Sequence, residues 1–142
     1  MPSAQRSISI NRPVSDVFAF VADGENARQW RPGVLDVARV SGDGQGAIYR
    51  QGVKGPGGRR IAADYEVTAF EPNQRIAFRA IAGPVRPSGE YRFTPEGDRT
   101  TVNFSLEATL TGWKALLMSR AVQSTMEGEM RTLDGLKQIL ES

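Results

Sequence analysis

The amino-acid sequence predicts an α+β domain in which an antiparallel sheet packs against one long C-terminal helix. Between Val34 and Leu110 apolar and polar residues alternate with a period of two, which is typical of strands. From Trp113 to Leu140 the apolar residues recur at helical spacing instead. The predicted strands are joined by short turns, whereas parallel neighbours would need longer crossovers. A chain of 142 residues has the length of one domain, so we expect a single domain over residues 1–142.

The N-terminal part predicts a short strand followed by two short helices. Ser7–Ile10 alternates as a strand. Asn11 and Pro13 then supply residues that favour a helix start, and helical spacing follows at Val14, Val17, Phe18 and Val21. A second short helix is expected over Glu25–Trp30, ended by Pro32.

Six further strands are expected between turns rich in glycine, proline, asparagine and aspartate. They run over Val34–Val40, Ala47–Val53, Arg60–Phe70, Arg75–Ile81, Gly89–Thr94 and Thr101–Leu110. Together with the first strand they predict a seven-stranded antiparallel sheet.

The turn at 71–74 predicts a register for its hairpin. If it pairs Phe70 with Arg75, Glu66 faces Arg79 across the strands as an opposite-charge pair. These charges then lie on the outer face of the sheet. The other face of the same hairpin is apolar.

The following hairpin places Tyr91 opposite Phe104 and Phe93 opposite Val102. Both hairpins then share one apolar face that has to be covered. The C-terminal helix, roughly 40 Å long at 1.5 Å per residue, is the element long enough to cover it.

The sequence contains neither cysteine nor histidine, which excludes several classes of catalytic site. Thiol nucleophiles, Ser-His-Asp triads and zinc sites of the usual nitrogen and sulfur kind all need one or the other. We therefore expect no metal and no cofactor. Acid–base chemistry would fall to Asp, Glu, Tyr or Lys side chains.

The charge balance and hydropathy narrow the possible partners. The net charge is +2, and the arginines are scattered along the strands rather than gathered into a dense stripe, so we expect no nucleic-acid partner. No run approaches the ~20 apolar residues of a membrane span, so we expect no membrane insertion. The N-terminus lacks the apolar block of a signal peptide, so we expect a cytoplasmic protein. We expect it to be a monomer or a homodimer.

Glu129 interrupts the apolar stripe of the C-terminal helix. At 100° per residue, six apolar residues fall within about 40° of one common direction, and Glu129 points almost along the middle of them: Met118, Val122, Met126, Leu133, Leu136 and Leu140. An ionised carboxylate in an apolar environment costs several kcal/mol unless it is paired or protonated. Two interpretations are open: Glu129 lies at the rim of the helix interface, or it is a cavity carboxylate with a raised pKa that accepts a ligand's proton or hydrogen bond.

Three tyrosines, Tyr49, Tyr65 and Tyr91, alternate with residues expected to be exposed, which turns their side chains toward the helix. Gln51 lies two residues after Tyr49 and is therefore expected on the same face of the strand. Core packing is one interpretation, because tyrosine is a good strand former. If two of the tyrosines reach the same hollow as Glu129, the set could orient a carbonyl or hydroxyl group of a ligand.

The order of these elements resembles the helix-grip fold of the START-like (SRPBCC, Bet v-like) superfamily, and specifically its polyketide cyclase/dehydrase-like branch. The residues that carry the resemblance are Ile10–Phe18, the turn with Asn26 and Trp30–Val34, Tyr65–Pro72, Arg75–Phe78 and Gly89–Phe93. The resemblance implies a deep cavity between the curved sheet and the long helix, usually used for a hydrophobic small molecule.

The resemblance leads us to expect a hydrophobic, oxygen-bearing ligand, polyketide- or lipid-like, in that cavity. The candidate ligand-binding residues are Trp30, Tyr49, Gln51, Tyr65, Tyr91, Phe104, Met126 and Glu129. If the protein is an enzyme, we expect cyclase/dehydrase-like chemistry with Glu129 as the base and a tyrosine donating to an enolate oxygen. The alternative is a protein-interaction module resembling the heat-shock chaperone activators of the same superfamily.

Overall fold

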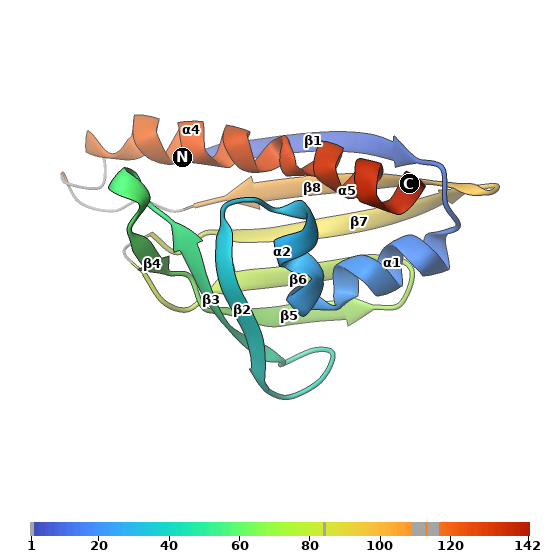
Figure 1. Ribbon diagram of the computed structural model, residues 1–142, viewed down its shortest axis with the longest axis horizontal. Coiled ribbons are helices and arrows are strands. Elements are labelled where there is room, and N and C mark those ends of the chain that lie inside the picture. The colour runs from blue at the N-terminus through green and yellow to red at the C-terminus, as the bar shows by residue number, and fades with distance from the viewer. Residues whose placement is uncertain (1, 84, 109–112, 114–116) are drawn as a thin grey trace.

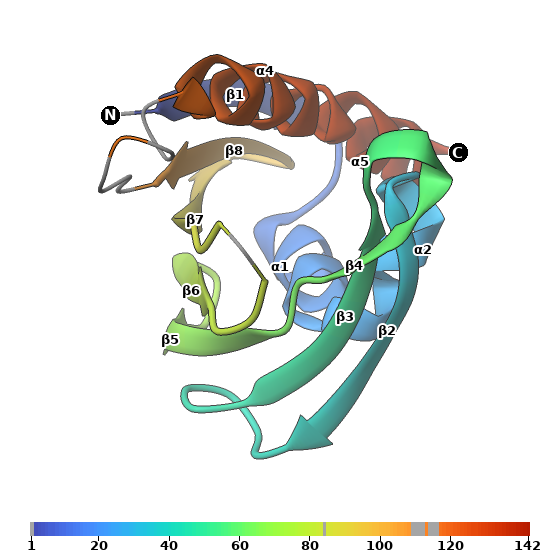
Figure 2. The same cartoon turned by 90° about the vertical axis from the view of Figure 1, so that its left-hand side faces the viewer.

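The computed structural model describes residues 2–83, 85–108, 113 and 117–142, and these form one curved antiparallel sheet with helices on its inner side (Figures 1 and 2). The strands are β1 (Ser3–Ile10), β2 (Val34–Ser41), β3 (Ile48–Lys54), β4 (Arg60–Ala62), β5 (Tyr65–Glu71), β6 (Arg75–Ala80), β7 (Ser88–Glu96) and β8 (Arg99–Glu107). The helical elements are α1 (Val14–Ala22), the 3₁₀ turn η1 (Gly24–Asn26), α2 (Ala27–Trp30), the 3₁₀ turn η2 (Pro56–Gly58), α4 (Ser119–Met130) and α5 (Thr132–Glu141).

Seven strands follow one another across the sheet in the order β1, β8, β7, β6, β5, β3, β2, and the short β4 pairs with β3. This confirms the α+β fold class and the antiparallel sheet. The single strand expected over Arg60–Phe70 is two strands in the structure. Its chain turns at Ala63 and Asp64, whose backbone N–H and side-chain oxygen bond to the carbonyl and N–H of Gln51 on β3. Those local bonds replace the regular ladder.

The hairpin of β5 and β6 confirms one predicted pair and corrects another. Glu66 lies opposite Arg79, and the two form an ion pair of 2.7 Å. Phe70 does not pair with Arg75, because Glu71 takes that position. A bulge between Val67 and Ala69 accounts for the difference, since one extra residue on β5 shifts the register beyond it.

The hairpin of β7 and β8 has the predicted register. Tyr91 lies opposite Phe104 and Phe93 opposite Val102. The rings of Tyr91 and Phe104 are stacked with centroids 4.2 Å apart. The end of the strand that we expected to reach Leu110 lies outside the described residues.

The C-terminal helix is broken into α4 and α5 at Arg131, rather than continuous over Trp113–Leu140 as expected (Figure 1). The Thr132 hydroxyl donates to the carbonyl of Glu129, an acceptor that the regular helix would give to Leu133 N–H. Except for Trp113, the segment 109–116 lies outside the described residues. α4 itself begins at Ser119.

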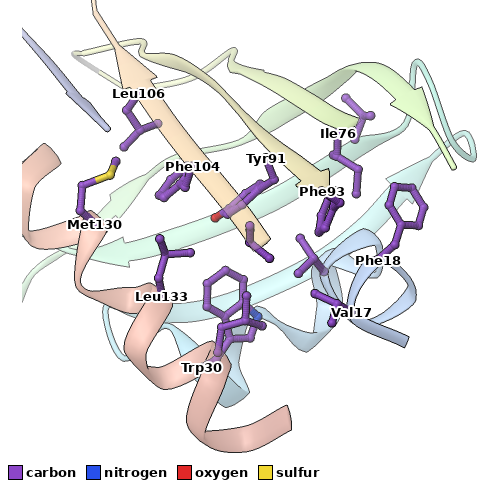
Figure 3. Packing of buried hydrophobic residues seen from close by; sticks show 14 of the residues in the cluster. Val17, Phe18, Trp30, Ile76, Tyr91, Phe93, Phe104, Leu106, Met130 and Leu133 are labelled. Carbon is purple, nitrogen blue, oxygen red and sulfur yellow. The ribbon is translucent and has the colours of Figure 1, made fainter. Parts of the chain in front are cut away.

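Most of the predicted apolar stripe on this helix is confirmed. Val122, Met126, Leu133 and Leu136 are buried, and Leu140 is half-buried. Met118 is 45% exposed, because it precedes the first turn of α4. Figure 3 shows Met130 and Leu133 turned toward Phe104 and Leu106 of β8.

The helices cover the inner face of the sheet unequally. α4 packs against β1 and β8, α5 packs against β1 and α2, and α1 packs against β7 and β8. The inner faces of β5 and β6 therefore lie beyond the reach of α4. Among the helices in the described ranges, none combines the length and the hydrophobicity needed to span a bilayer.

On the outer face, Glu90 of β7 links two arginines. Its carboxylate accepts hydrogen bonds from Arg75 at 2.5 Å and from Arg92 at 2.8 Å. Burial raises the pKa of Glu90, but the bonds from the two arginines lower it more, so the net pKa lies below its usual value. The network joins β6 to β7 across the sheet.

We expect Glu90→Gln to lower stability above the ordinary carboxyl pKa and to lose this effect in acid. A folded-state pKa below the unfolded one stabilises the fold above the unfolded pKa, and this stabilisation is lost as the pH falls through the folded value. The cost at pH 7 should be about 1 kcal/mol. Urea unfolding of both proteins from pH 7 to pH 3 measures the difference.

Glu107→Gln is the matched control, because Glu107 is exposed on β8 and forms no ion pair with a described residue. A constant difference between wild type and Glu90→Gln at every pH would contradict the prediction.

Candidate functional site

Four aromatic rings form a row across the inner face of the sheet. They come from neighbouring strands: Tyr65 on β5, Phe78 on β6, Tyr91 on β7 and Phe104 on β8. Successive ring centroids lie 5.9, 6.2 and 4.2 Å apart. Tyr91 and Phe104 are buried, whereas Tyr65 and Phe78 are half-buried. The end of the row that α4 does not cover is thus accessible, and it is apolar.

Tyr49 extends the row onto β3. Its ring stacks on Tyr65 with centroids 5.0 Å apart, and its hydroxyl accepts the N–H of Gly24 at 3.4 Å. Burial raises the pKa of both phenols. The two hydroxyls therefore stay protonated at neutral pH.

Glu129 forms an ion pair with Arg31, the residue directly after α2. The Arg31 Nη2 donates to Glu129 Oε2 at 2.9 Å, and the two side chains are 19% and 27% exposed. This carboxylate is thus neither sealed in the core nor fully in water. Sequence reasoning missed Arg31 as a site residue. The available signal was an arginine in the turn between the buried Trp30 and the exposed Pro32, just before β2.

The charge of Arg31 acts on the inner face of the sheet. Burial lowers the pKa of its guanidinium, but Glu129 and the phenols of Tyr91 and Tyr65 raise it more, so the net pKa lies above its usual value. Burial raises the pKa of the Tyr91 phenol. The nearby charge of Arg31 lowers that pKa, but by less, so the net shift is upward. Neither the Tyr65 nor the Tyr91 hydroxyl forms a hydrogen bond with a described residue.

Two buried polar atoms have no hydrogen-bond partner among the described residues, namely Arg31 Nε and Gln51 Oε1. Gln51 is 5% exposed, and its amide nitrogen donates to the carbonyl of Ala63 at 3.2 Å. Buried polar groups in proteins are nearly always paired. A donor and an acceptor are therefore available on this side of the sheet.

The remaining predicted residues pack in the core. Trp30 is buried and meets the Tyr91 ring edge-on at 6.1 Å, while Phe104 and Met126 are buried in the main cluster. Within the described segments, no three His, Cys, Asp or Glu side chains converge as they would around a metal ion.

Two hollows lie away from the Arg31 pair. One of about 300 Å³ lies between α1 and the β2–β3 hairpin, and Tyr49, Phe70 and Ile76 are among its lining residues. The other, about 710 Å³, is a depression in the sheet whose lining includes Phe78 of the row as well as the outer-face Arg75. Neither includes Arg31 or Glu129, so the cavity expected between sheet and C-terminal helix stays a prediction.

We expect Gly24→Ala to destabilise the protein by about 1–3 kcal/mol, as overpacking does. A Cβ at Gly24 would lie 2.7 Å from Tyr49 Cε2 and would also clash with the Tyr65 hydroxyl. In a Tyr65→Phe background the cost should shrink, because one of the two clashes is removed. Chemical denaturation of the single and double variants measures both effects.

Gly128→Ala provides the control, since a Cβ there meets no atom within 4 Å. It lies inside α4 and should stabilise the helix by up to about 1 kcal/mol. Equal stability of Gly24→Ala and wild type would contradict the prediction.

Comparison with known proteins supports this assignment of fold. The chain is similar to TTHA0849 from Thermus thermophilus (TM-score 0.81, 23% identity, 96% of this chain and 95% of that one). It is similar to the Zhui aromatase/cyclase from Streptomyces sp. R1128 (TM-score 0.79, 18% identity, covering 98% of this chain and 93% of that one). It is also similar to a START superfamily protein from Mycobacterium smegmatis (TM-score 0.73, 17% identity, covering 97% of this chain and 98% of that one).

Identities this low show the shared fold alone. A comparison with curated protein sequences finds no match. The family model described as polyketide cyclase / dehydrase and lipid transport matches residues 1–141, almost the whole sequence. The chain therefore belongs to the polyketide cyclase/dehydrase and lipid transport family.

Proposed function

We propose that this protein binds a hydrophobic, oxygen-bearing small molecule, polyketide- or lipid-like, between the inner face of the sheet and the C-terminal helices. The observation that carries the proposal is the row of rings ending in the half-buried Tyr65 and Phe78, with the Arg31–Glu129 pair acting on the same face. Ligand sites commonly combine an apolar lining with a few polar groups that fix orientation. Family membership supports the same function.

The apolar part of the ligand would supply most of the affinity. Burial of apolar surface contributes about 25 cal/mol per Å². The protonated phenols of Tyr65 and Tyr91 can donate to a carbonyl or hydroxyl oxygen of the ligand. Gln51 Oε1 can accept from a ligand hydroxyl.

If the protein turns its ligand over, the groups present suit proton abstraction next to a carbonyl followed by ring closure and loss of water. Glu129 Oε2 is bonded to Arg31, but Oε1 forms no hydrogen bond with a described residue. Oε1 would take the proton from the carbon, and a tyrosine O–H would stabilise the enolate oxygen. The enolate carbon would then attack a second carbonyl of the same ligand, and the protonated Glu129 would return its proton to the alkoxide that forms. Removal of a second proton from the same carbon by Glu129, and its delivery to the departing hydroxyl group, would release that oxygen as water.

We expect lipophilic ketones and phenols to raise the melting temperature of the protein. A ligand at about 100 times its Kd adds about 2.7 kcal/mol of stability. Phe78→Ala should weaken binding measured by calorimetry, because it removes a ring from the accessible end of the row. Arg92→Ala, on the outer face of β7, should leave the affinity unchanged.

Native mass spectrometry of the purified protein provides a second readout. A co-purifying small molecule supports the proposal. An empty protein that no member of a lipophilic library stabilises would contradict it and favour the protein-interaction module.

The catalytic part of the proposal has its own test. We expect Glu129→Gln to slow cyclisation of a synthetic linear polyketide thioester by about 10²–10⁴-fold, the usual contribution of a general base. Product formation is followed by chromatography after the uncatalysed rate is subtracted. Glu127→Gln, an exposed position on the same helix, is the control. Equal rates for wild type and Glu129→Gln would remove Glu129 from the mechanism.

A further inference from the structure

Arg31 uses only part of its hydrogen-bonding capacity within the described residues. Its single bond runs from Nη2 to Glu129 Oε2, and its buried Nε–H has no partner among the same residues. A guanidinium carries five N–H donors in a planar fork. Glu129 therefore binds this arginine at one atom and leaves the neighbouring donor on the same edge unused.

That edge has the geometry that a carboxylate prefers. Nε–H and Nη2–H point in parallel, and a carboxylate can accept from both at once. Glu129 reaches Nη2 alone, because its position on α4 is set by the buried Met126 and Met130 on the same helix. A carboxylate that is not tied to the chain could take both donors.

Few groups around Arg31 compete with a ligand carboxylate for its hydrogen-bond donors. Besides Glu129, the groups that act electrostatically on it are the phenols of Tyr91 and Tyr65, which are uncharged at neutral pH. Glu129 is partly exposed and can turn toward water when it is displaced. Arg31 therefore offers one exchangeable counter-ion position next to the row of rings.

Resting on the proposed function, we propose that the ligand is an apolar or aromatic carboxylic acid. Its carboxylate takes the Nε and Nη2 donors of Arg31 in place of Glu129. Its apolar body lies along the row formed by Tyr65, Phe78, Tyr91 and Phe104. The proposal makes Arg31 the residue that determines specificity for an acid over a neutral analogue.

Two matched pairs of probes test this: 1-naphthaleneacetic acid with 1-naphthaleneacetamide, and dodecanoic acid with dodecanol. Each is titrated into the full chain at pH 7.5 by calorimetry. We expect at least one acid to bind about tenfold or more tightly than its neutral partner, as charge-assisted hydrogen bonds allow. Neutral members that bind as tightly as the acids would overturn this inference and leave the proposed function standing.

Variants of the ion pair give effects of opposite sign. Arg31→Gln should abolish the preference for the acid, because the carboxylate then meets the charge of Glu129 without a counter-ion. Glu129→Gln should tighten binding of the acid several-fold relative to its neutral partner, because it removes the carboxylate that competes for Arg31. Arg28→Gln removes the same charge from an exposed position on α2 and should leave the preference intact.

Circular dichroism and melting curves check that each variant folds. If Arg31→Gln does not fold, Arg31→Lys keeps the charge but removes the planar fork, and it should reduce the preference to a few-fold. A preference for the acid that stays undiminished in Arg31→Gln, or in Arg31→Lys where Arg31→Gln does not fold, would overturn the inference. If no member of either pair binds the wild type, the proposed function fails and the inference fails with it.

Discussion

The pairing of the first strand with the last is the interaction on which the rest of the structure depends. β1 and β8 pair along eight consecutive positions, from Ser3 opposite Glu107 to Ile10 opposite Thr100. Because α4 and α5 both pack against β1, this pairing places the C-terminal helices alongside the N-terminal and the last strands (Figure 1). The helices can then bury the inner face of β8, where Phe104 and Val102 are almost fully enclosed. Without β1 the apolar side of the C-terminal helices would have much less to pack against.

The same arrangement explains why the accessible apolar surface lies where it does. The helices reach β1 and β8, and α1 reaches β7, so Tyr65 and Phe78 on the middle strands remain half-buried. Desolvation of an unpaired carboxylate on an apolar helix face is unfavourable. Arg31, at the end of α2, supplies the opposite charge that offsets it. One pair thereby joins α2 to α4 and places charge beside the rings.

Particular elements show how far the fold followed from the residues. The β7–β8 register was predictable because strict alternation leaves only one way to turn Tyr91 and Phe104 to the same face. The division of β4 from β5 was not predictable from the sequence, because it depends on hydrogen bonds between the Ala63 and Asp64 pair and Gln51, which lies on another strand. The helix break at Arg131 has a local cause, the bond from the Thr132 hydroxyl to the carbonyl of Glu129, but periodicity of apolar residues continues across it and so does not reveal it.

The sequence by itself determined which side chains share a face: the period of two placed the tyrosines and phenylalanines on one side of the sheet, and the helical period placed Glu129 among the apolar residues of its helix. Periodicity is a local property, so neighbouring residues are enough to reveal it. Only the tertiary structure decided what Glu129 meets. Its partner lies 98 residues away in the chain, in a turn whose direction is set by packing of α2 against α5 and of Trp30 against Tyr91.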